Sequence, residues 1–281
     1  MKAIIVTGAT SGIGYEVCRA LLNENFRVIG IGHSKEKTEE AQKSLNKEFP
    51  EQKSLFFYRD LMQQNEIICL CDELSELLNS ECDGKLHALI NNAGCVRSWY
   101  TTTDEGIEQQ LALNHLSGFL LAYRMMPFVK NAKGRVIFTS SNSHKKMKMR
   151  WNDIMFKNRY NPLLAYKQSK LCNLLTAYAI NDRFVKEGIR AYGVDPGLVK
   201  TNIGNKQTGG LINLIWTIRK QHGVEPEIPA RTYLYLCMQE EHPDGLYYYN
   251  SEQKQYSRHV NKENADRLFS LSEKLCGIDF L

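Results

Sequence analysis

Short apolar runs alternate along the chain with longer segments of helical period, and this alternation limits the fold more than any other feature. The runs lie at residues 3–7, 27–31, 55–58, 86–91, 135–139, 190–194 and 246–249. Strands that alternate with helices are typical of βαβ units and a parallel sheet. Several runs are continuously hydrophobic, as expected for strands covered by helices on both faces. The sequence therefore predicts an α/β fold with a doubly wound, seven-stranded parallel sheet flanked by helices.

The segments between the runs predict helices over residues 13–23, 35–48, 63–79, 104–129, 229–239 and 262–275. The clearest helix begins at Asn161-Pro162, a capping residue followed by a proline suited to the first helical position. It ends near Gly188, because glycine adopts the left-handed conformation that closes a helix. Four of its side chains recur at helical spacing and are expected to face the core: Leu171, Leu174, Leu175 and Tyr178.

The composition is close to that of an average globular protein, with 43% hydrophobic and 24% charged residues among 281. The net charge of +5, from 36 basic and 31 acidic side chains, is too small and too scattered to indicate a nucleic-acid partner. There is no internal repeat, low-complexity tract or long linker. We therefore predict a single domain over residues 1–281.

The eight cysteines include no C-x-x-C pair and no Cys/His cluster with zinc spacing, so we predict free thiols and no metal site. The chain enters a strand at Lys2 without the pattern of a signal peptide. No apolar run approaches the roughly 20 residues that cross a bilayer. A cytoplasmic protein with no membrane span is expected.

A glycine-rich segment, TGATSGIG at residues 7–14, lies between the first strand and the first helix. Glycine permits a tight turn, lets the backbone approach a pyrophosphate and brings the helix close to the sheet. The helix N-terminus adds unpaired N–H groups and a positive dipole. A strand can also turn into a helix through glycines and bind nothing. The position of this segment favours a Rossmann-type fold that binds a dinucleotide.

The second strand is followed by His33, Ser34 and Lys35, with no acidic residue before Glu36. Folds that bind NAD tend to place a carboxylate there for the ribose diol, and a carboxylate would repel a 2′-phosphate. A serine and lysine cations can instead hold that phosphate, which favours NADP(H), unless these side chains are only a solvated loop. Asp60, after the third strand, could accept from the adenine amino group or cap the following helix.

Tyr166 and Lys170 lie four residues apart on the long helix, so both side chains emerge on one face. The pKa of an unperturbed tyrosine is about 10, and a nearby ammonium lowers it by favouring the phenolate. Alone, Y-x-x-x-K is more often a surface pair. Here Ser140-Ser141, NNAG at 91–94 and DPGLVKT at 195–201 end or follow other strands, where open α/β sheets bind ligands.

The glycine loop, NNAG, the strand-end serine, Y-x-x-x-K and PG-x-V-x-T occur in the order in which the short-chain dehydrogenase/reductase family has them. The sequence resembles that family over nearly its whole length. Residues 160–171 and 265–275 resemble its retinol-dehydrogenase-like branch. That branch often has arginine where His33 stands, and its membrane-bound members carry an N-terminal apolar anchor that has no counterpart here.

The resemblance implies a catalytic role for four residues. Tyr166 would be the general acid/base, and Lys170 its pKa-lowering and ribose-binding partner. Ser141 would bond the substrate oxygen, with Ser140 as a rival at the same strand end. Asn114 would hold a water in a proton relay with Lys170.

The same resemblance places Asn92 at the adenine side of the cofactor, and Val199 and Thr201 at the nicotinamide end. A homodimer or homotetramer is expected, because these assemblies are common in the family. The full set of predicted cofactor-binding residues is Gly8, Ser11, Gly12, Ile13, Gly14, His33, Ser34, Lys35, Asp60, Leu61, Asn92, Ala93, Gly94, Tyr166, Lys170, Pro196, Gly197, Val199 and Thr201.

Two further segments are candidates for substrate contact. The insert at residues 142–165 mixes lysines and arginines with methionines and aromatics; it is either a solvated excursion or a border of the substrate pocket. Residues 202–228 contain an apolar stretch, 209–216, that could be a hinged lid or a packing or oligomer contact. Both segments point to a bulky, lipophilic ketone or aldehyde.

We therefore predict an NADP(H)-dependent oxidoreductase that transfers hydride between the nicotinamide and the carbonyl/alcohol pair of a small molecule. In reduction Ser141 polarises the oxygen and Tyr166 donates the proton. The alternatives are an NAD-dependent alcohol dehydrogenase and a non-catalytic nucleotide-sensing protein on the same fold. A sugar-nucleotide epimerase or dehydratase also uses Y-x-x-x-K, but this glycine spacing and NNAG fit it poorly.

Overall fold

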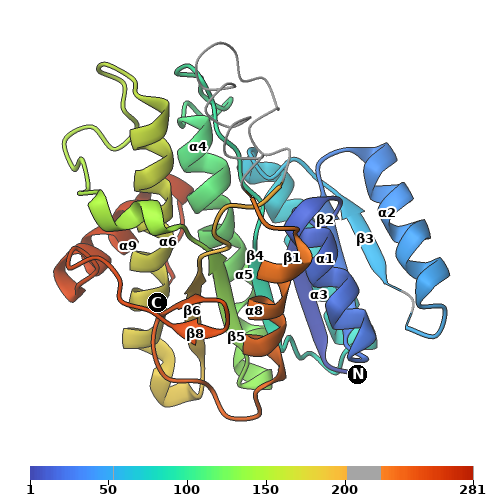
Figure 1. Cartoon of the computed structure of the whole chain (residues 1–281). Coiled ribbons are helices and arrows are strands. Elements are labelled where there is room, and N and C mark those ends of the chain that lie inside the picture. Colours follow the sequence, from blue (N-terminus) through green and yellow to red (C-terminus); the bar gives the residue numbers. More distant parts are fainter. Residues whose placement is uncertain (53, 201–222, 281) are drawn as a thin grey trace.

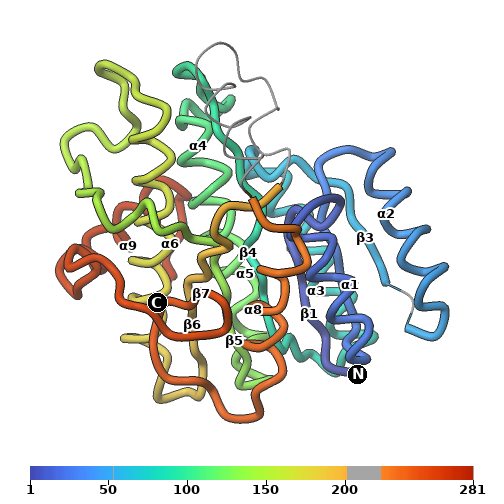
Figure 2. The backbone as a smooth tube through the Cα atoms, viewed as in Figure 1, coloured from blue at the N-terminus to red at the C-terminus, as the bar shows by residue number. Residues whose placement is uncertain are grey.

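The central sheet runs in the order β3-β2-β1-β4-β5-β6-β7-β8 in a computed structural model that describes residues 1–52, 54–200 and 223–280 (Figures 1 and 2). Its first seven strands are parallel, as predicted. An eighth strand of two residues pairs antiparallel with β7. The strands are β1 (Ala3–Thr7), β2 (Arg27–Gly32), β3 (Leu55–Tyr58), β4 (Ala88–Asn91), β5 (Arg135–Thr139), β6 (Arg190–Val194), β7 (Tyr247–Tyr249) and β8 (Glu252–Gln253).

Helices cover both faces of the sheet, and alternate residues of β1 show why. Ile4 and Val6 pack into one apolar cluster and Ile5 into the other. The first cluster is closed by α1 (Gly12–Asn23), α2 (Lys35–Glu48) and α8 (Glu227–Met238). The second is closed by α3 (Gln64–Glu81), α5 (Ser117–Ala132), α6 (Pro162–Phe184) and α9 (Lys262–Cys276).

The helix predicted over residues 104–129 is wrong at its start. Residues 102–108 form a turn in which Gly106 has φ +77° and Thr102 pairs with Glu108. The helix begins only after Glu108, whose buried carboxylate accepts from the N–H groups of Gln110 and Leu111. It then runs through α4 (Gln109–Leu111) and a π-helical stretch, η1 (Ala112–Leu116), into α5.

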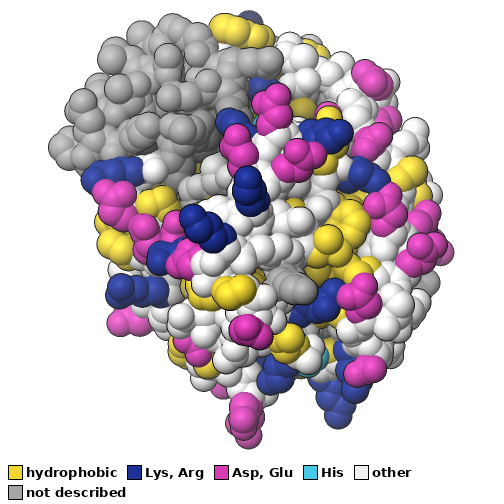
Figure 3. Space-filling view, turned by 90° about the vertical axis from the view of Figure 1, so that its right-hand side faces the viewer, with side chains coloured by type: hydrophobic (Ala, Val, Ile, Leu, Met, Phe, Trp, Pro, Cys, Tyr) yellow, Lys and Arg dark blue, Asp and Glu magenta, His cyan; other side chains and the backbone are white. Residues whose placement is uncertain are grey.

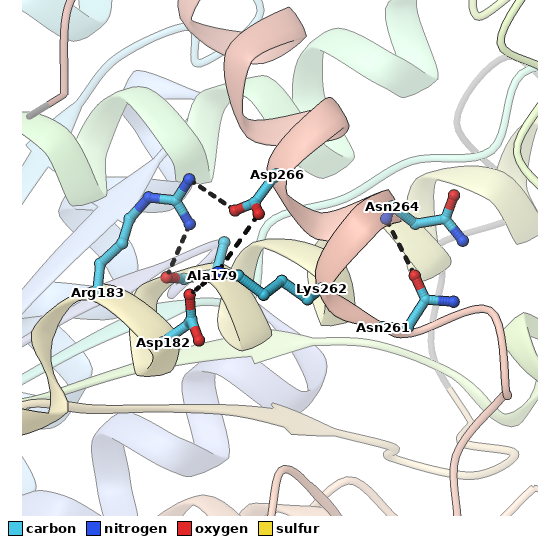
Figure 4. A network of polar contacts seen from close by, with 7 residues as sticks. All are labelled: Ala179, Asp182, Arg183, Asn261, Lys262, Asn264 and Asp266. Atoms are coloured by element: carbon cyan, nitrogen blue, oxygen red, sulfur yellow. Dashed lines mark hydrogen bonds and ion pairs between the residues drawn. The ribbon is translucent and has the colours of Figure 1, made fainter.

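An amphipathic helix buries one face, but α6 is buried around most of its surface, because both the sheet and α9 pack on it. Leu171, Leu174 and Leu175 are fully buried, as predicted, whereas Tyr178 is half-buried. On the outer side Arg183 pairs with Asp266 of α9 at 2.9 Å, and Lys262 pairs with Asp182 (Figure 4). A short 3-10 turn, η3 (Val185–Glu187), follows the helix and ends at Gly188, as predicted.

Acidic and basic side chains are interspersed on the side of the molecule where α2 lies (Figure 3). Within the described ranges, none of the helices is both long enough and apolar enough to cross a membrane.

Candidate active site

The glycine loop brings β1 and α1 so close together that side chains are excluded. A Cβ on Gly14 would lie 2.2 Å from the carbonyl oxygen of Gly8. Gly8 and Gly12 have φ angles of +67° and +55°, in the left-handed region that glycine adopts without strain. Ser11 precedes α1 but its side chain does not cap the helix. The first N–H groups of α1 are thus placed to receive a phosphate, and the loop fits a pyrophosphate.

Thr7 and Asn92 fasten this loop to the end of β4. The hydroxyl of Thr7 accepts from the main-chain N–H groups of Asn92 and Ala93, each at 2.9 Å. The Asn92 amide donates to the carbonyl of Thr7 at 3.0 Å. A Cβ on Gly8 would lie 3.1 Å from Ala93. Asn92 therefore holds the glycine loop in place through its bonds to Thr7. Thr7 was not among the site residues predicted from the sequence.

The residues predicted to contact a 2′-phosphate directly follow β2. His33 and Lys35 are exposed, while Ser34 is half-buried at the N-cap position of α2 without a side-chain cap. Asp60 is exposed and closes a turn by accepting from Met62 N–H at 3.0 Å. The alternative that Asp60 caps α3 is wrong, because the N-cap of that helix is Gln63. The side chain of Leu61, also predicted to bind cofactor, is buried in the core.

Tyr166 and Lys170 meet on α6, as their spacing predicts. The Lys170 ammonium lies 5.5 Å from the centroid of the Tyr166 ring and donates to the carbonyl of Thr139, at the end of β5, at 3.0 Å. The lysine is fully buried, and this desolvation lowers its pKa to about 8. Tyr166 is half-buried. A buried cation with a lowered pKa thus lies beside the phenol.

Asn114 lies in the π-helical stretch η1, and three bonds fix its amide. Its oxygen accepts from Cys95 N–H at 2.7 Å, and its nitrogen donates to the Cys95 carbonyl and to Ser169 Oγ, each at 3.0 Å. A Cβ on Gly94 would lie 3.1 Å from the Asn114 oxygen and 3.7 Å from the Lys170 ammonium. Glycine at 94 therefore leaves the space between these two groups open.

The two serines after β5 have different surroundings. Ser140 is fully buried, and its hydroxyl donates to the carbonyl of Lys170 at 2.9 Å. Ser141 is half-buried, and its hydroxyl accepts from Ser143 N–H at 3.3 Å. Ser140 is thus engaged in packing α6 onto the sheet, which favours Ser141 as the hydroxyl that meets a substrate.

A buried polar chain that sequence reasoning missed joins Ser141 to the turn after β6. His144 contacts the Ser141 carbonyl through Nδ1 and lies edge-on to the ring of Tyr247, with centroids 4.8 Å apart. The Tyr247 hydroxyl donates to the Asp195 carboxylate at 2.7 Å, and the other oxygen of that carboxylate accepts from Gly197 N–H at 2.9 Å. The sequence signals were a histidine three residues after Ser141 and an acid before Pro196.

The predicted nicotinamide end is described up to Lys200. Pro196 and Gly197 form the turn after β6, in which Gly197 has φ +71°, and Val199 forms a bridge with Val224. Thr201 lies outside the described residues, as does the proposed lid except for residues 223–228. In the described end of that segment, Val224 forms the bridge with Val199, and α8 begins at Glu227. Residues 223–228 are therefore held by regular secondary structure.

The insert at residues 142–165 is anchored from α6 and is not simply a solvated excursion. It opens with the 3-10 turn η2 (Asn142–Lys146). Gln168 accepts from Arg150 N–H and donates to the Ile154 carbonyl, each at 2.8 Å. Met147 and Phe156 are buried in the core. The insert therefore has a packed inner side, while a contact with substrate stays a prediction.

The chain matches the short chain dehydrogenase family over residues 2–210. Retinol dehydrogenase 12 from Mus musculus is 32% identical over 284 residues, which cover 99% of this chain and 87% of that protein. Polyprenol dehydrogenase from Homo sapiens is 28% identical over 295 residues, which cover 99% and 86%.

Solved structures share the fold. An uncharacterized protein from Mycobacterium paratuberculosis superposes with a TM-score of 0.77 at 26% identity and covers 100% of this chain and 95% of its own. A short-chain dehydrogenase from Sphingobium yanoikuyae in complex with NADPH has a TM-score of 0.67 at 20% identity and covers 88% and 87%. The chain belongs to the short-chain dehydrogenase/reductase family, in its retinol-dehydrogenase-like branch, and is an oxidoreductase that acts on an alcohol or carbonyl group with a nicotinamide cofactor.

Proposed function

We propose that this protein is an NADP(H)-dependent oxidoreductase that interconverts a lipophilic ketone or aldehyde and its alcohol, with Tyr166 as the proton carrier. The observation that carries the proposal is the position of the buried Lys170 ammonium, 5.5 Å from the Tyr166 ring centroid. Thr139 holds this ammonium at a strand end, on the same edge of the sheet as the glycine loop.

The residues at that edge divide the chemistry between them. A bound nicotinamide would supply or accept the hydride. The positive charge of Lys170 favours the phenolate of Tyr166, so the hydroxyl can give its proton to a substrate oxygen in reduction and regain it in oxidation. Ser141 donates to that oxygen as charge develops on it. Asn114 positions α6 through Ser169, whose hydroxyl donates to the Tyr166 carbonyl.

The preference for NADP(H) rests on the residues after β2. His33 and Lys35 are exposed and Ser34 half-buried, and no carboxylate stands at these three positions to repel a 2′-phosphate. Lys35→Glu should weaken NADPH binding and leave NADH binding little changed. Lys43→Glu makes the same charge change on the same helix, farther from its N-terminus, and should change neither. Equal affinity of the unaltered protein for NADPH and NADH would refute the preference.

The substrate class rests on the relatives. Retinol and polyprenol, named in two of them, are both long isoprenoid alcohols. We propose that the substrate is likewise lipophilic and that the inner residues of the insert border it. A cytoplasmic location and assembly into a homodimer or homotetramer stay predictions.

The decisive experiment follows NADPH oxidation with retinoid, polyprenal and simple carbonyl substrates in the unaltered protein and in Tyr166→Phe. The variant removes only the hydroxyl, so turnover should fall by at least about a hundredfold while the Kd for NADPH changes by no more than about threefold. Turnover retained in this variant would remove Tyr166 from its proposed role. Tight NADPH binding without turnover on any carbonyl would instead favour a nucleotide-sensing protein.

A further inference from the structure

A basic cleft of about 490 Å³, wide open to solvent, lies on the surface beside the turn that follows Ser141. One wall carries Lys145, Lys146 and Lys148 of the insert. The other is residues 255–259, which include an arginine and a histidine. These walls are more than a hundred residues apart in the sequence, so the fold itself brings their cations together.

The cations of the cleft differ from their neighbours in having no carboxylate partner. Arg150 pairs with Asp153 and Lys254 with Glu252, just outside the cleft. In the part of the chain that the structure describes, none of the three lysines or Arg258 forms an ion pair. The pKa of His259 is lowered by burial and by the charges of Arg258 and Lys148. Several positive charges thus act at one point of the surface without compensation.

Both walls are held rigidly by the core beneath them. Ser257 N–H donates to the buried His144 ring at 3.2 Å, which joins one wall to the other. Ser257 also closes its own wall, because its hydroxyl accepts from His259 N–H at 3.2 Å. Asn261 caps α9 by accepting from Asn264 N–H (Figure 4). The Asn264 side-chain amide donates to the His259 carbonyl. These bonds fix the main chain beneath the cleft before a ligand binds, so that only the exposed side chains need ordering.

We propose that this cleft binds a phosphate group. Its lining includes Lys146, Lys148 and Arg258, whose charges have no carboxylate partner among the described residues, while the Lys145 ammonium lies 5.7 Å from the centroid of the Tyr247 ring. A phosphate carries up to two charges and three acceptor oxygens to meet these cations. A single carboxylate would leave most of this charge uncompensated. The phosphate can belong to a soluble phosphate ester or to the headgroup of an anionic phospholipid. The proposal goes beyond hydride transfer and does not depend on it.

The first experiment titrates the full-length protein with pyrophosphate and follows the His259 ring by proton NMR, with His259→Gln to assign its signal. A bound anion offsets the cations that lower the pKa of His259, so this pKa should rise by about one unit. Lys148→Glu and Arg258→Gln, one in each wall, should abolish the rise. Lys157→Glu changes a lysine of the same insert outside the cleft and should leave it intact.

The second experiment separates the two phosphate sources by sedimentation with vesicles of phosphatidylcholine, with and without phosphatidic acid. Binding of pyrophosphate alone indicates a soluble ester. Binding to the acidic vesicles that pyrophosphate displaces, and that Lys148→Glu loses, indicates a lipid headgroup. An unchanged His259 pKa together with no vesicle binding would overturn the proposal. So would equal effects of Lys148→Glu and Lys157→Glu, because general basicity would then suffice.

Discussion

The imidazole of His144 contacts the main-chain oxygen of Ser141 through Nδ1, at 2.6 Å, inside the protein. A carbonyl oxygen only accepts, so Nδ1 carries the hydrogen. The other ring nitrogen faces Ser257 N–H at 3.2 Å and must therefore be the acceptor. The ring is neutral and of fixed tautomer, and burial lowers its pKa. His144 is thus suited to hold Ser141 in place.

Two variants of His144 test its bond to the Ser141 carbonyl separately from its bond to Ser257 N–H. Asparagine keeps an N–H near the position of Nδ1, whereas glutamine reaches the position of Nε2 with an acceptor. If His144 positions Ser141, His144→Gln should lower kcat roughly tenfold to a hundredfold with little change in the Kd for NADPH, whereas His144→Asn should lower kcat by no more than about threefold. Steady-state kinetics and thermal unfolding of both variants test this. Equal losses of stability with equal kcat values would show a purely structural role.

Alanine variants of the two serines that follow β5 should have different effects, one on kcat and the other on stability. Ser141→Ala removes the proposed donor to the substrate oxygen, and kcat should fall by about a hundredfold or more. Ser140→Ala loses only the bond to the Lys170 carbonyl, so unfolding should become easier by about 1 kcal/mol while kcat changes little. Kinetics and denaturant unfolding of both variants decide. The reverse pattern would make Ser140 the substrate ligand.

The buried charge of Lys170 should lower the free energy of unfolding, and Lys170→Met, which removes that charge, should raise it again. Its pKa falls from 10.5 to about 8 on folding, so between these values the unfolded chain holds a proton that the folded chain has lost. The free energy of unfolding should therefore rise with pH from 8 to 10.5 in the unaltered protein, relative to Lys170→Met. Below pH 8 the variant should be more stable by up to about 3 kcal/mol, although inactive.

Asn173 makes this comparison a clean one, since its amide also donates to the Thr139 carbonyl at 3.0 Å and keeps that acceptor satisfied in Lys170→Met. Urea unfolding at pH 7 and at pH 10 measures the difference. The same pH dependence in both proteins would show that Lys170 is not the group responsible.

The sequence alone predicted the parts of this molecule that depend on local pattern. Seven of the strands, the glycine loop and the Tyr166–Lys170 spacing follow from periodicity and from the sterics of glycine. The start of the helix at Gln109 did not follow, because its cap is a buried glutamate that also accepts from the hydroxyl of Tyr160, 52 residues away. Helix propensity depends on neighbouring residues in the sequence, so it cannot identify Glu108 as a cap when a distant tyrosine holds its carboxylate in place.

The candidate site shows the same division. Motifs in the sequence mark Ser141, Tyr166 and Lys170, and the resemblance to the family adds Asn114. Their supports lie far away in the sequence: His144 meets Ser257 across 113 residues and Thr7 meets Asn92 across 85. Side chains of ordinary type, such as Thr7, acquire a role only when the sheet brings two strand ends together. A single sequence can mark one member of such a pair, as it does His144, but it does not indicate the partner.

The bond between Tyr247 and Asp195 offers a last test of the polar chain behind the active site. Both side chains are buried, and the hydroxyl donates to the carboxylate at 2.7 Å. Tyr247→Phe leaves a buried charged oxygen without its donor. It should therefore lower the free energy of unfolding by roughly 2–3 kcal/mol, while Asp195→Asn and the double variant should reveal a coupling energy of about 1.5–3 kcal/mol.

A matched control is Tyr192→Phe, which removes a fully buried tyrosine hydroxyl that donates to a neutral carbonyl, that of Pro243, at 2.9 Å. Its loss should be smaller, about 1 kcal/mol, because the acceptor carries no charge. Tyr247→Phe should also weaken cofactor binding, since Asp195 accepts from Gly197 N–H in the turn predicted to hold the nicotinamide end. Tyr192 does not contact that turn through this bond, so Tyr192→Phe should leave the Kd for NADPH unchanged. Equal effects of the two phenylalanine variants on stability and on Kd would mean that the Asp195 carboxylate does not need its tyrosine partner.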